Sequence, residues 1–127
     1  MVPFSDDSRS RAFSKVMCLS DDPQALRAVQ RASTELDVEG AYSMPIIFEL
    51  APPGVSKASG LQRLLDILDM GDSRLLAAGD GQNDRALLEL ADQSFAPASA
   101  PEEIRRLAQQ VIDVPAAGLL GPMLGQL

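Results

Sequence analysis

Two acidic residues flanking a short polar turn are the side chains of this sequence whose types and spacing could do chemistry. The segment 75–91, "LLAAGDGQNDRALLELA", places Asp80 and Asp84 directly after an apolar run. A carboxylate is a hard oxygen ligand that suits Mg²⁺, Gly81 lets the backbone approach an ion, and Asn83 adds an amide donor. Asp84 opens the next predicted helix, near its positive end. The combination is typical of a site that binds a phosphate and a metal.

Lys57 is the third informative residue. It follows "PPGVS" and begins a predicted helix, so its ammonium can project to the same edge. There it would hold a phosphate or pair with Asp84. The alternative is that segment 80–84 is only a capped turn and that Lys57 is a solvated surface residue. Spacing alone does not separate these two interpretations.

Composition limits the classes of protein to consider. The chain has 127 residues, 46% of them hydrophobic, which suits one small domain. Its net charge of −7 argues against a nucleic-acid partner. No apolar run approaches the roughly 20 residues of a membrane span, and the polar start lacks a secretory signal. The single cysteine excludes a disulfide within the chain. The absence of histidine excludes imidazole as a base or as a metal ligand. We expect Cys18, within "KVMCL", to be a small core residue and the protein to be cytoplasmic.

The first half of the chain predicts a strand, a helix and a second strand. Residues 1–12 are polar and are expected to be frayed. A strand is predicted over 13–19, and Asp22 and Pro23 then start a helix that runs to about Leu36. Its apolar stripe comprises Leu26, Val29, Ser33 and Leu36. A further strand is predicted over 46–50, with Ile46, Phe48 and Leu50 on one face and Glu49 on the other; a short strand near Ala41 is less well defined.

The second half alternates between helices and strands. Residues 52–54 break the chain and suggest a boundary between two units. A helix over 56–69 with the stripe Leu61, Leu64, Leu65 and Leu68 follows, then a strand over 74–78 and a helix over 84–91. A short strand at "QSFAPA", a helix with capping-box spacing from Ser99 to Glu102, a strand at "VIDV" and a loose terminal helix complete the order. This alternation predicts an α/β fold with a parallel sheet and covering helices.

Three segments together resemble a known family. "PPGVSKASGLQRLLDIL", "LLAAGDGQNDRALLELA" and "FAPASAPEEIRRLAQQVI" have the order and spacing of the haloacid-dehalogenase-like (HAD) phosphatases, most similar to the Cof-type sugar-phosphatase branch. The resemblance covers residues 13–127. It implies a partial Rossmann-like HAD core with parallel strands and covering helices over 52–127, preceded by an α+β remnant of the cap domain over 13–51.

The resemblance also implies roles for the residues singled out above. Lys57 falls on the phosphate-stabilising lysine, and Asp80, with Gly81 beside it, falls on the acidic Mg²⁺ ligand. Asn83 falls on a phosphate-contacting asparagine. Asp84 falls on the second acid, which orients the lysine and a metal-bound water, so that Lys57 and Asp84 are the implied catalytic residues. "FAPASA" departs from the family's "VAMGNA", which puts the contact between that strand and the metal loop in doubt.

The family's nucleophile has no counterpart in the sequence. It is the first aspartate of a D-x-D that ends an N-terminal strand, whereas Asp6 and Asp7 are adjacent and follow no apolar strand. Ser20 ends a strand, as a phosphate-binding serine would, but its distance before Lys57 fits a cap strand better. In the family the nucleophile's strand lies beside the strand that ends at Asp80. Its absence predicts an open edge at 74–78, and therefore self-association or pairing with a chain that supplies the missing half.

Two hypotheses for function remain. The first is the C-terminal portion of a Mg²⁺-dependent phosphatase that acts on a small phosphorylated metabolite of the sugar phosphate class, and that is inactive alone. The second is a non-catalytic binding or interaction module derived from the family. A response-regulator-like domain is disfavoured, because its lysine follows the acids whereas Lys57 precedes Asp80.

Overall fold

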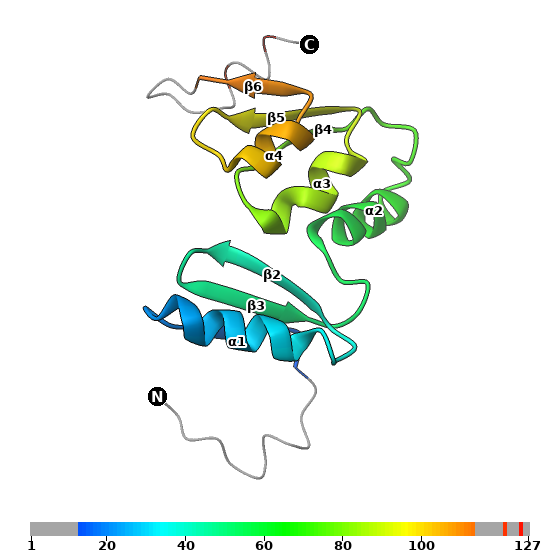
Figure 1. The fold of residues 1–127 in the computed structure, drawn as a ribbon. Coiled ribbons are helices and arrows are strands. Elements are labelled where there is room, and N and C mark those ends of the chain that lie inside the picture. The colour runs from blue at the N-terminus through cyan, green and yellow to red at the C-terminus, as the bar shows by residue number, and fades with distance from the viewer. Residues whose placement is uncertain (1–12, 114–120, 122–124, 126–127) are drawn as a thin grey trace.

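The computed structural model of the chain describes residues 13–113, 121 and 125. Its elements form two three-stranded sheets that follow one another along the chain (Figure 1). They are β1 (Val16–Leu19), α1 (Pro23–Ser33), β2 (Glu39–Met44), β3 (Ile47–Ala51), α2 (Lys57–Ile67), β4 (Leu76–Ala78), the 3₁₀ turn η2 (Gln82–Asp84), α3 (Arg85–Leu90), β5 (Gln93–Pro97), α4 (Glu102–Leu107) and β6 (Gln110–Ile112). We call 16–51 the antiparallel unit and 57–112 the parallel unit.

The antiparallel unit is a sheet with a helix on one face. Its strand order is β1-β3-β2, so β3 is central. The helix α1 starts where the side chain of Asp22 accepts a hydrogen bond from the backbone N–H of Gln24, with Pro23 at the first position. Phe48 of β3 and Leu26 of α1 are both fully buried. Because side chains alternate along a strand, Glu49 points to the face that α1 does not cover.

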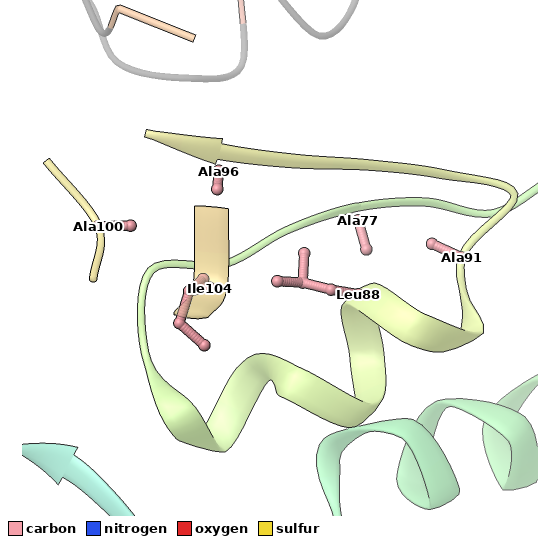
Figure 2. Packing of buried hydrophobic residues seen from close by; sticks show 6 residues of the cluster. All are labelled: Ala77, Leu88, Ala91, Ala96, Ala100 and Ile104. Atoms are coloured by element: carbon pink, nitrogen blue, oxygen red, sulfur yellow. The ribbon is translucent and has the colours of Figure 1, made fainter. Parts of the chain in front are cut away.

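The parallel unit is organised around β5. The strand order is β4-β5-β6, with all pairs parallel. One buried cluster joins α3 and α4 to the strands, and Figure 2 shows Leu88 and Ile104 pointing from the two helices toward it. Its members are Ala77, Leu88, Ala91, Ala96, Ala100 and Ile104. Four of the six are alanines, which lets the short helices lie close to the sheet. The loop after β4 is thereby fixed at the carboxyl edge.

The expected α/β fold is confirmed, but several boundaries were wrong. The first strand begins at Val16, α1 ends at Ser33 before Leu36, and Ile46 lies outside β3. The last helix has Pro101 as its N-cap and no side-chain capping bond, so the capping box at Ser99 does not form. Because α4 begins at Glu102, directly after Pro101, Ser99 lies two residues before the N-cap and is out of position for a capping box. That helix ends at Leu107 rather than reaching Val111, because the chain turns at once into β6.

The predicted apolar stripe of α2 is only partly covered, since Leu61 and Leu65 are half-buried and Leu64 and Leu68 are exposed. Leu64 is 49% and Leu68 54% accessible to solvent, although their spacing predicted burial. The physical reason is that no described element packs over that side of the helix, which contributes only Ala58 to the buried set. Cys18 is half-buried rather than a core residue. The predictions for residues 1–12 and for the terminal helix lie outside the described part of the chain.

None of the helices in the described residues has the length and apolar character needed to cross a membrane.

Candidate active site

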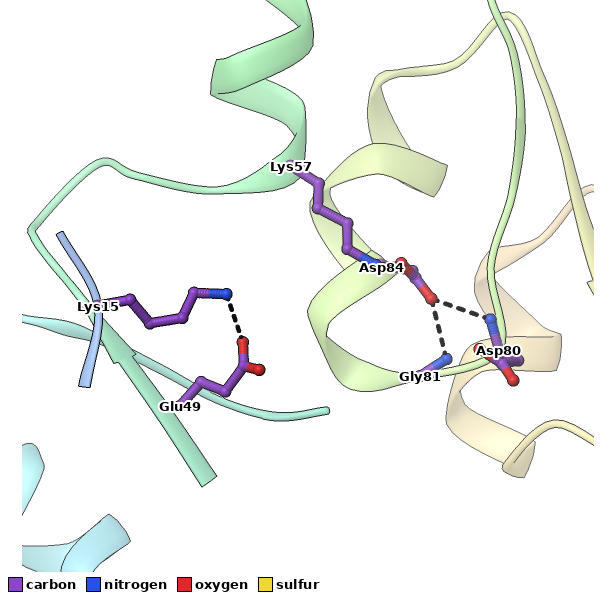
Figure 3. A network of polar contacts seen from close by, with 6 residues as sticks. All are labelled: Lys15, Glu49, Lys57, Asp80, Gly81 and Asp84. Carbon is purple, nitrogen blue, oxygen red and sulfur yellow. Dashed lines mark hydrogen bonds and ion pairs between the residues drawn. The ribbon is translucent and has the colours of Figure 1, made fainter. Parts of the chain in front are cut away.

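One buried carboxylate shapes the loop that follows β4. Oδ2 of Asp84 accepts hydrogen bonds from the backbone N–H of Asp80 at 3.1 Å and from that of Gly81 at 3.2 Å (Figure 3). The side chain of Asp84 is only 8% exposed. The two N–H donors offset the cost of burying a charged group. The loop is therefore closed by its own acid, at the edge of a parallel sheet where ligands bind in α/β proteins.

Gly79 makes this close approach possible, and the sequence argument did not single it out. A Cβ atom at Gly79 would lie 2.4 Å from the Cβ of Asp84. The backbone N–H of Gly79 donates to the carbonyl oxygen of Phe95 at 3.1 Å, which ties the start of the loop to β5. A glycine directly before an acid at a strand end was the available signal. The site therefore needs glycine at this position for space.

Lys57 reaches the same loop from the first turn of α2. The helix starts with a capping box, in which Ser56 and Ser59 bond each other's backbone N–H groups. From there the Lys57 ammonium forms an ion pair with Oδ1 of Asp84, as Figure 3 shows. The lysine side chain is 51% exposed. One face of the ammonium is thus held by the carboxylate while the other remains accessible to a ligand.

The structure brings the predicted residues to one edge of the sheet. Lys57 contacts Asp84, and Asp84 binds the amides of Asp80 and Gly81. Asp80 itself is exposed at the strand end, and Asn83 is half-buried on the wall of a cleft. Their roles in binding phosphate or metal stay predictions.

The donors for a metal ion are incomplete here. Within the described residues there is no group of three acidic, histidine or cysteine side chains placed to hold an ion. Oδ1 of Asp84 pairs with Lys57 and Oδ2 accepts two amides, which leaves the carboxylate of Asp80 as the exposed acid of the loop. Mg²⁺ prefers six oxygen ligands in near-octahedral geometry. The loop can supply part of such a site and does not complete it.

A cleft of about 510 Å³ separates the loop from the antiparallel sheet. One wall is the sheet face that α1 leaves uncovered, and the other is formed by the starts of α2 and α3 with η2. Lys15 and Glu49 form an ion pair of 2.8 Å on the sheet wall (Figure 3). Sequence reasoning placed Glu49 opposite Phe48 but did not connect it to the site. The signal was that alternation, combined with the position of β3 directly before Lys57.

The electrostatics of this wall favour an ionised glutamate. The hydrogen bond from Lys15 lowers the pKa of Glu49 below its usual value of 4.5, against a smaller upward effect of burial. Ser43 lowers it further by hydrogen bonding, and the charges of Lys15 and Lys57 act in the same direction. Lys57 and Glu49 line the same cleft, so the charge of one acts weakly on the other. The cleft thus has the ammonium of Lys57 on one wall and the ion-paired carboxylate of Glu49 on the other.

Comparison with known proteins identifies the family. The model of the haloacid dehalogenase-like hydrolases matches residues 3–118. The chain belongs to this family. The Cof-type resemblance inferred from the GDGQND loop and Lys57 is confirmed, and the fold is a partial HAD fold.

Three relatives show how much of the family fold is present. A phosphoglycolate phosphatase of Aeropyrum pernix is 38% identical over 91 residues, which are 70% of this chain and 38% of that protein. A haloacid dehalogenase-like hydrolase from B. subtilis has a TM-score of 0.73 at 27% identity, over 84% of this chain and 40% of the other. A HAD subclass IIB sugar phosphatase, at 16% identity, shares the fold with a TM-score of 0.68 over 84% of this chain and 40% of the other. The chain spans about two fifths of the length of these relatives.

Proposed function

We propose that this chain carries part of the active site of a Mg²⁺-dependent phosphatase that hydrolyses a small phosphorylated metabolite of the sugar phosphate class. The observation that carries the proposal is the ion pair between Lys57 and the buried Asp84 at the end of β4. An ammonium that is held by a carboxylate, on a side chain that is half exposed, suits the binding of a phosphate group during its transfer. The names of the family relatives, several of them phosphoglycolate phosphatases, support a phosphate monoester as substrate, although the body of phosphoglycolate is a carboxylate and the ligand of this chain need not share it.

Each residue of the loop has a distinct role in this proposal. Lys57 donates to phosphate oxygens and offsets the charge that develops on them. Asn83 donates its amide to the same group. Asp84 does not touch the substrate; it holds the lysine ammonium in place beside the cleft and keeps the loop closed.

The metal would be held by Asp80 and the backbone at Gly81 together with ligands from outside the described residues. HAD hydrolases generally use Mg²⁺. When bound, such an ion offsets negative charge on a phosphate. Without those further ligands, the donor set of the described residues is incomplete.

The nucleophile is proposed to lie outside this chain. In the mechanism that the family resemblance implies, an aspartate oxygen forms a bond to phosphorus while the ester P–O bond breaks, and the leaving alcohol takes a proton from a second aspartate. Water then hydrolyses the aspartyl-phosphate. A chain that lacks these two acids binds phosphate but does not turn over.

Phosphate binding tests the proposal without requiring turnover. Inorganic phosphate, titrated against the chain and followed by ³¹P NMR, is expected to bind weakly, and Lys57→Met is expected to weaken binding by about tenfold, as for loss of one charged hydrogen bond. Arg63→Met is the matched control, because it removes one positive charge from the exposed side of the same helix. Equal binding by both variants would contradict the site.

Turnover provides the second test. We expect no hydrolysis of p-nitrophenyl phosphate by the purified chain, with or without Mg²⁺. Hydrolysis that disappears in Asp80→Ala would refute the missing nucleophile and require a substitute within this chain.

The alternative is a non-catalytic module that binds a phosphorylated ligand or a partner protein. Both hypotheses accommodate the incomplete metal donor set of the described residues. The coding sequence upstream discriminates between the two. An in-frame apolar strand ending in D-x-D supports the enzyme, and a stop codon directly before Met1 supports the module.

A further inference from the structure

The wall of the cleft opposite Lys57 is rich in hydrogen-bond acceptors. Glu39 and Glu49 lie on this wall, and both line the cleft. Glu39 accepts a hydrogen bond from the backbone N–H of Gly54 at 3.2 Å, and Glu49 accepts one from Lys15 at 2.8 Å. A ligand held by Lys57 therefore extends toward carboxylate oxygens.

The positive charges around the cleft are already paired in the described part of the chain. Lys15 pairs with Glu49, Arg85 pairs with Glu89 at 3.1 Å, and Lys57 pairs with Asp84. Glu39 has no lysine or arginine partner among these described pairs. A negatively charged group on the far end of a ligand would thus face carboxylates and would have to displace an existing ion pair to find a cation.

Glu49 is the better placed of the two acids. Its side chain is 18% exposed, whereas Glu39 is an exposed residue. Lys15 lowers the pKa of Glu49 from a usual value that already lies well below neutral pH, so the ionised group accepts hydrogen bonds and donates none. Lys15 beside it supplies donors. Together they match a group that both donates and accepts, which is the chemistry of a hydroxyl.

We propose that Glu49, positioned by Lys15, is a specificity-determining residue that selects phosphate monoesters with a neutral, hydroxylated body over those whose body carries a carboxylate. The proposal rests on the proposed function, because it assumes that the phosphate is held by Lys57. Hydroxyl groups of the selected ligand donate to Glu49, while a carboxylate at the same place is repelled by it. Selection of this kind works by an unfavourable contact with the wrong ligand as well as by a favourable one with the right ligand.

A matched pair of probes tests the selection in the intact chain. Glycerol 3-phosphate and 3-phosphoglycerate share their skeleton and differ in a terminal hydroxymethyl group against a carboxylate. We expect the chain to bind glycerol 3-phosphate about tenfold more tightly, the effect of one charged hydrogen bond gained and one repulsion avoided. Calorimetric titration or ³¹P NMR measures both affinities.

Variants of Glu49 and of Lys15 should have opposite effects on the preference for glycerol 3-phosphate over 3-phosphoglycerate. Glu49→Gln leaves Lys15 unpaired, so the preference should fall to about onefold or invert, since the free ammonium attracts the carboxylate. Lys15→Met leaves Glu49 without its cation, so the preference should stay or grow. Glu49→Asp retains the charge and should retain the sign. Glu102→Gln, which breaks the exposed pair with Arg106 on α4, is the control.

The outcomes separate this inference from the proposed function. If Lys57→Met weakens both probes while Glu49→Gln leaves their ratio unchanged, the phosphate site stands and the role of Glu49 is overturned. If Glu49→Gln weakens the binding of both probes equally, so that the ratio of their affinities is kept, the role of Glu49 is merely structural. That result also overturns the proposed selection by Glu49. If neither probe binds to the folded wild-type chain, both proposals fail.

Discussion

Two lysine–carboxylate pairs face one cleft, one from each unit, and they differ in how the acid is held. Both lysine side chains are 51% exposed. Asp84 is 8% exposed and its second oxygen is occupied by two backbone amides of its own loop. Glu49 is 18% exposed and lies on the surface of a strand, held mainly by Lys15. The loop pair is fixed by the local chain path, whereas the strand pair can change its partners. The proposed roles of the two pairs, a constant phosphate site at Lys57 and a selector at Glu49, are chosen to match that difference.

The largest expected effect is self-association of the chain through its parallel unit and not through its antiparallel unit. Among the described strands β4 pairs only with β5, and nearby α2 exposes Leu64, Ile67 and Leu68 at 49%, 66% and 54%. An unprotected edge with apolar flanks favours pairing. We expect light scattering to show a mass above 13.5 kDa that rises with concentration. Ile67→Lys should lower that mass and Leu36→Lys, in the antiparallel unit, should not.

A soluble, cooperatively folded monomer at every concentration would contradict the open edge. It would mean that another part of the chain covers β4 and α2 in solution.

The next largest effect is expected from a substitution that disturbs the Lys57–Asp84 pair and leaves the Lys15–Glu49 pair unchanged. Gly79→Ala places a methyl group against the Cβ of Asp84 and is expected to destabilise the fold by about 2–3 kcal/mol, the usual cost of overpacking. Gly60→Ala on α2 meets no atom within 4 Å and should stabilise by up to about 1 kcal/mol through helix propensity. Urea unfolding measures both. Equal stabilities would show that the loop relaxes around the added methyl.

A direct comparison of the two acids is predicted to give unequal losses of stability. Asp84→Asn turns an NH₂ group toward the lysine or the backbone amides, and should cost about 2 kcal/mol because a buried acceptor is lost. Glu49→Gln should cost about 0.5 kcal/mol, as for an ion pair whose lysine is half exposed and screened by solvent. Thermal and urea unfolding of both variants decide this. A loss at Glu49 as large as at Asp84 would remove the distinction between fixed and adjustable pairs.

The smallest effect concerns the titration of Glu49. Its pKa is lowered in the folded chain from the usual 4.5, first by Lys15. The ionised group therefore contributes stability above pH 4.5, and this contribution is lost as the pH falls through the lowered pKa. Lys15→Met should raise the pKa toward the usual value, as followed by carboxyl-carbon NMR. An unchanged pKa in that variant would mean that Lys15 does not hold Glu49 in solution.

The candidate loop was predictable because its determinants are local. The apolar run before Gly79, the acid at its end and the acid four residues later fix a strand, a turn and a helix start within one short segment. Lys57 was predictable for a similar reason, since Ser56 and the preceding prolines mark a helix start. The family resemblance then supplied roles for these residues, which the geometry alone does not test.

The strand pair was not predictable from local signals. Lys15 and Glu49 are 34 positions apart and meet only because β1 pairs with β3 in the register that places Met17 opposite Glu49. That register depends on the packing of Phe48 under α1, which no single segment encodes. The predicted burial of the α2 stripe was wrong for the opposite reason. Its local pattern predicts burial, but burial needs a facing element, and no described element covers Leu64 and Leu68.

The connection between β3 and α2 gives the molecule a mechanical property. Within residues 13–113 it is the single covalent link between the two units, and Gly54 at its centre has a φ of +72°. The bond from Gly54 to Glu39 ties this link to the outer strand β2, while its far end is the first turn of α2, which carries Lys57. The turn at Gly54 therefore sets the spacing between the outer strand β2 and the helix turn that carries Lys57, and with it the width of the cleft that both of them line.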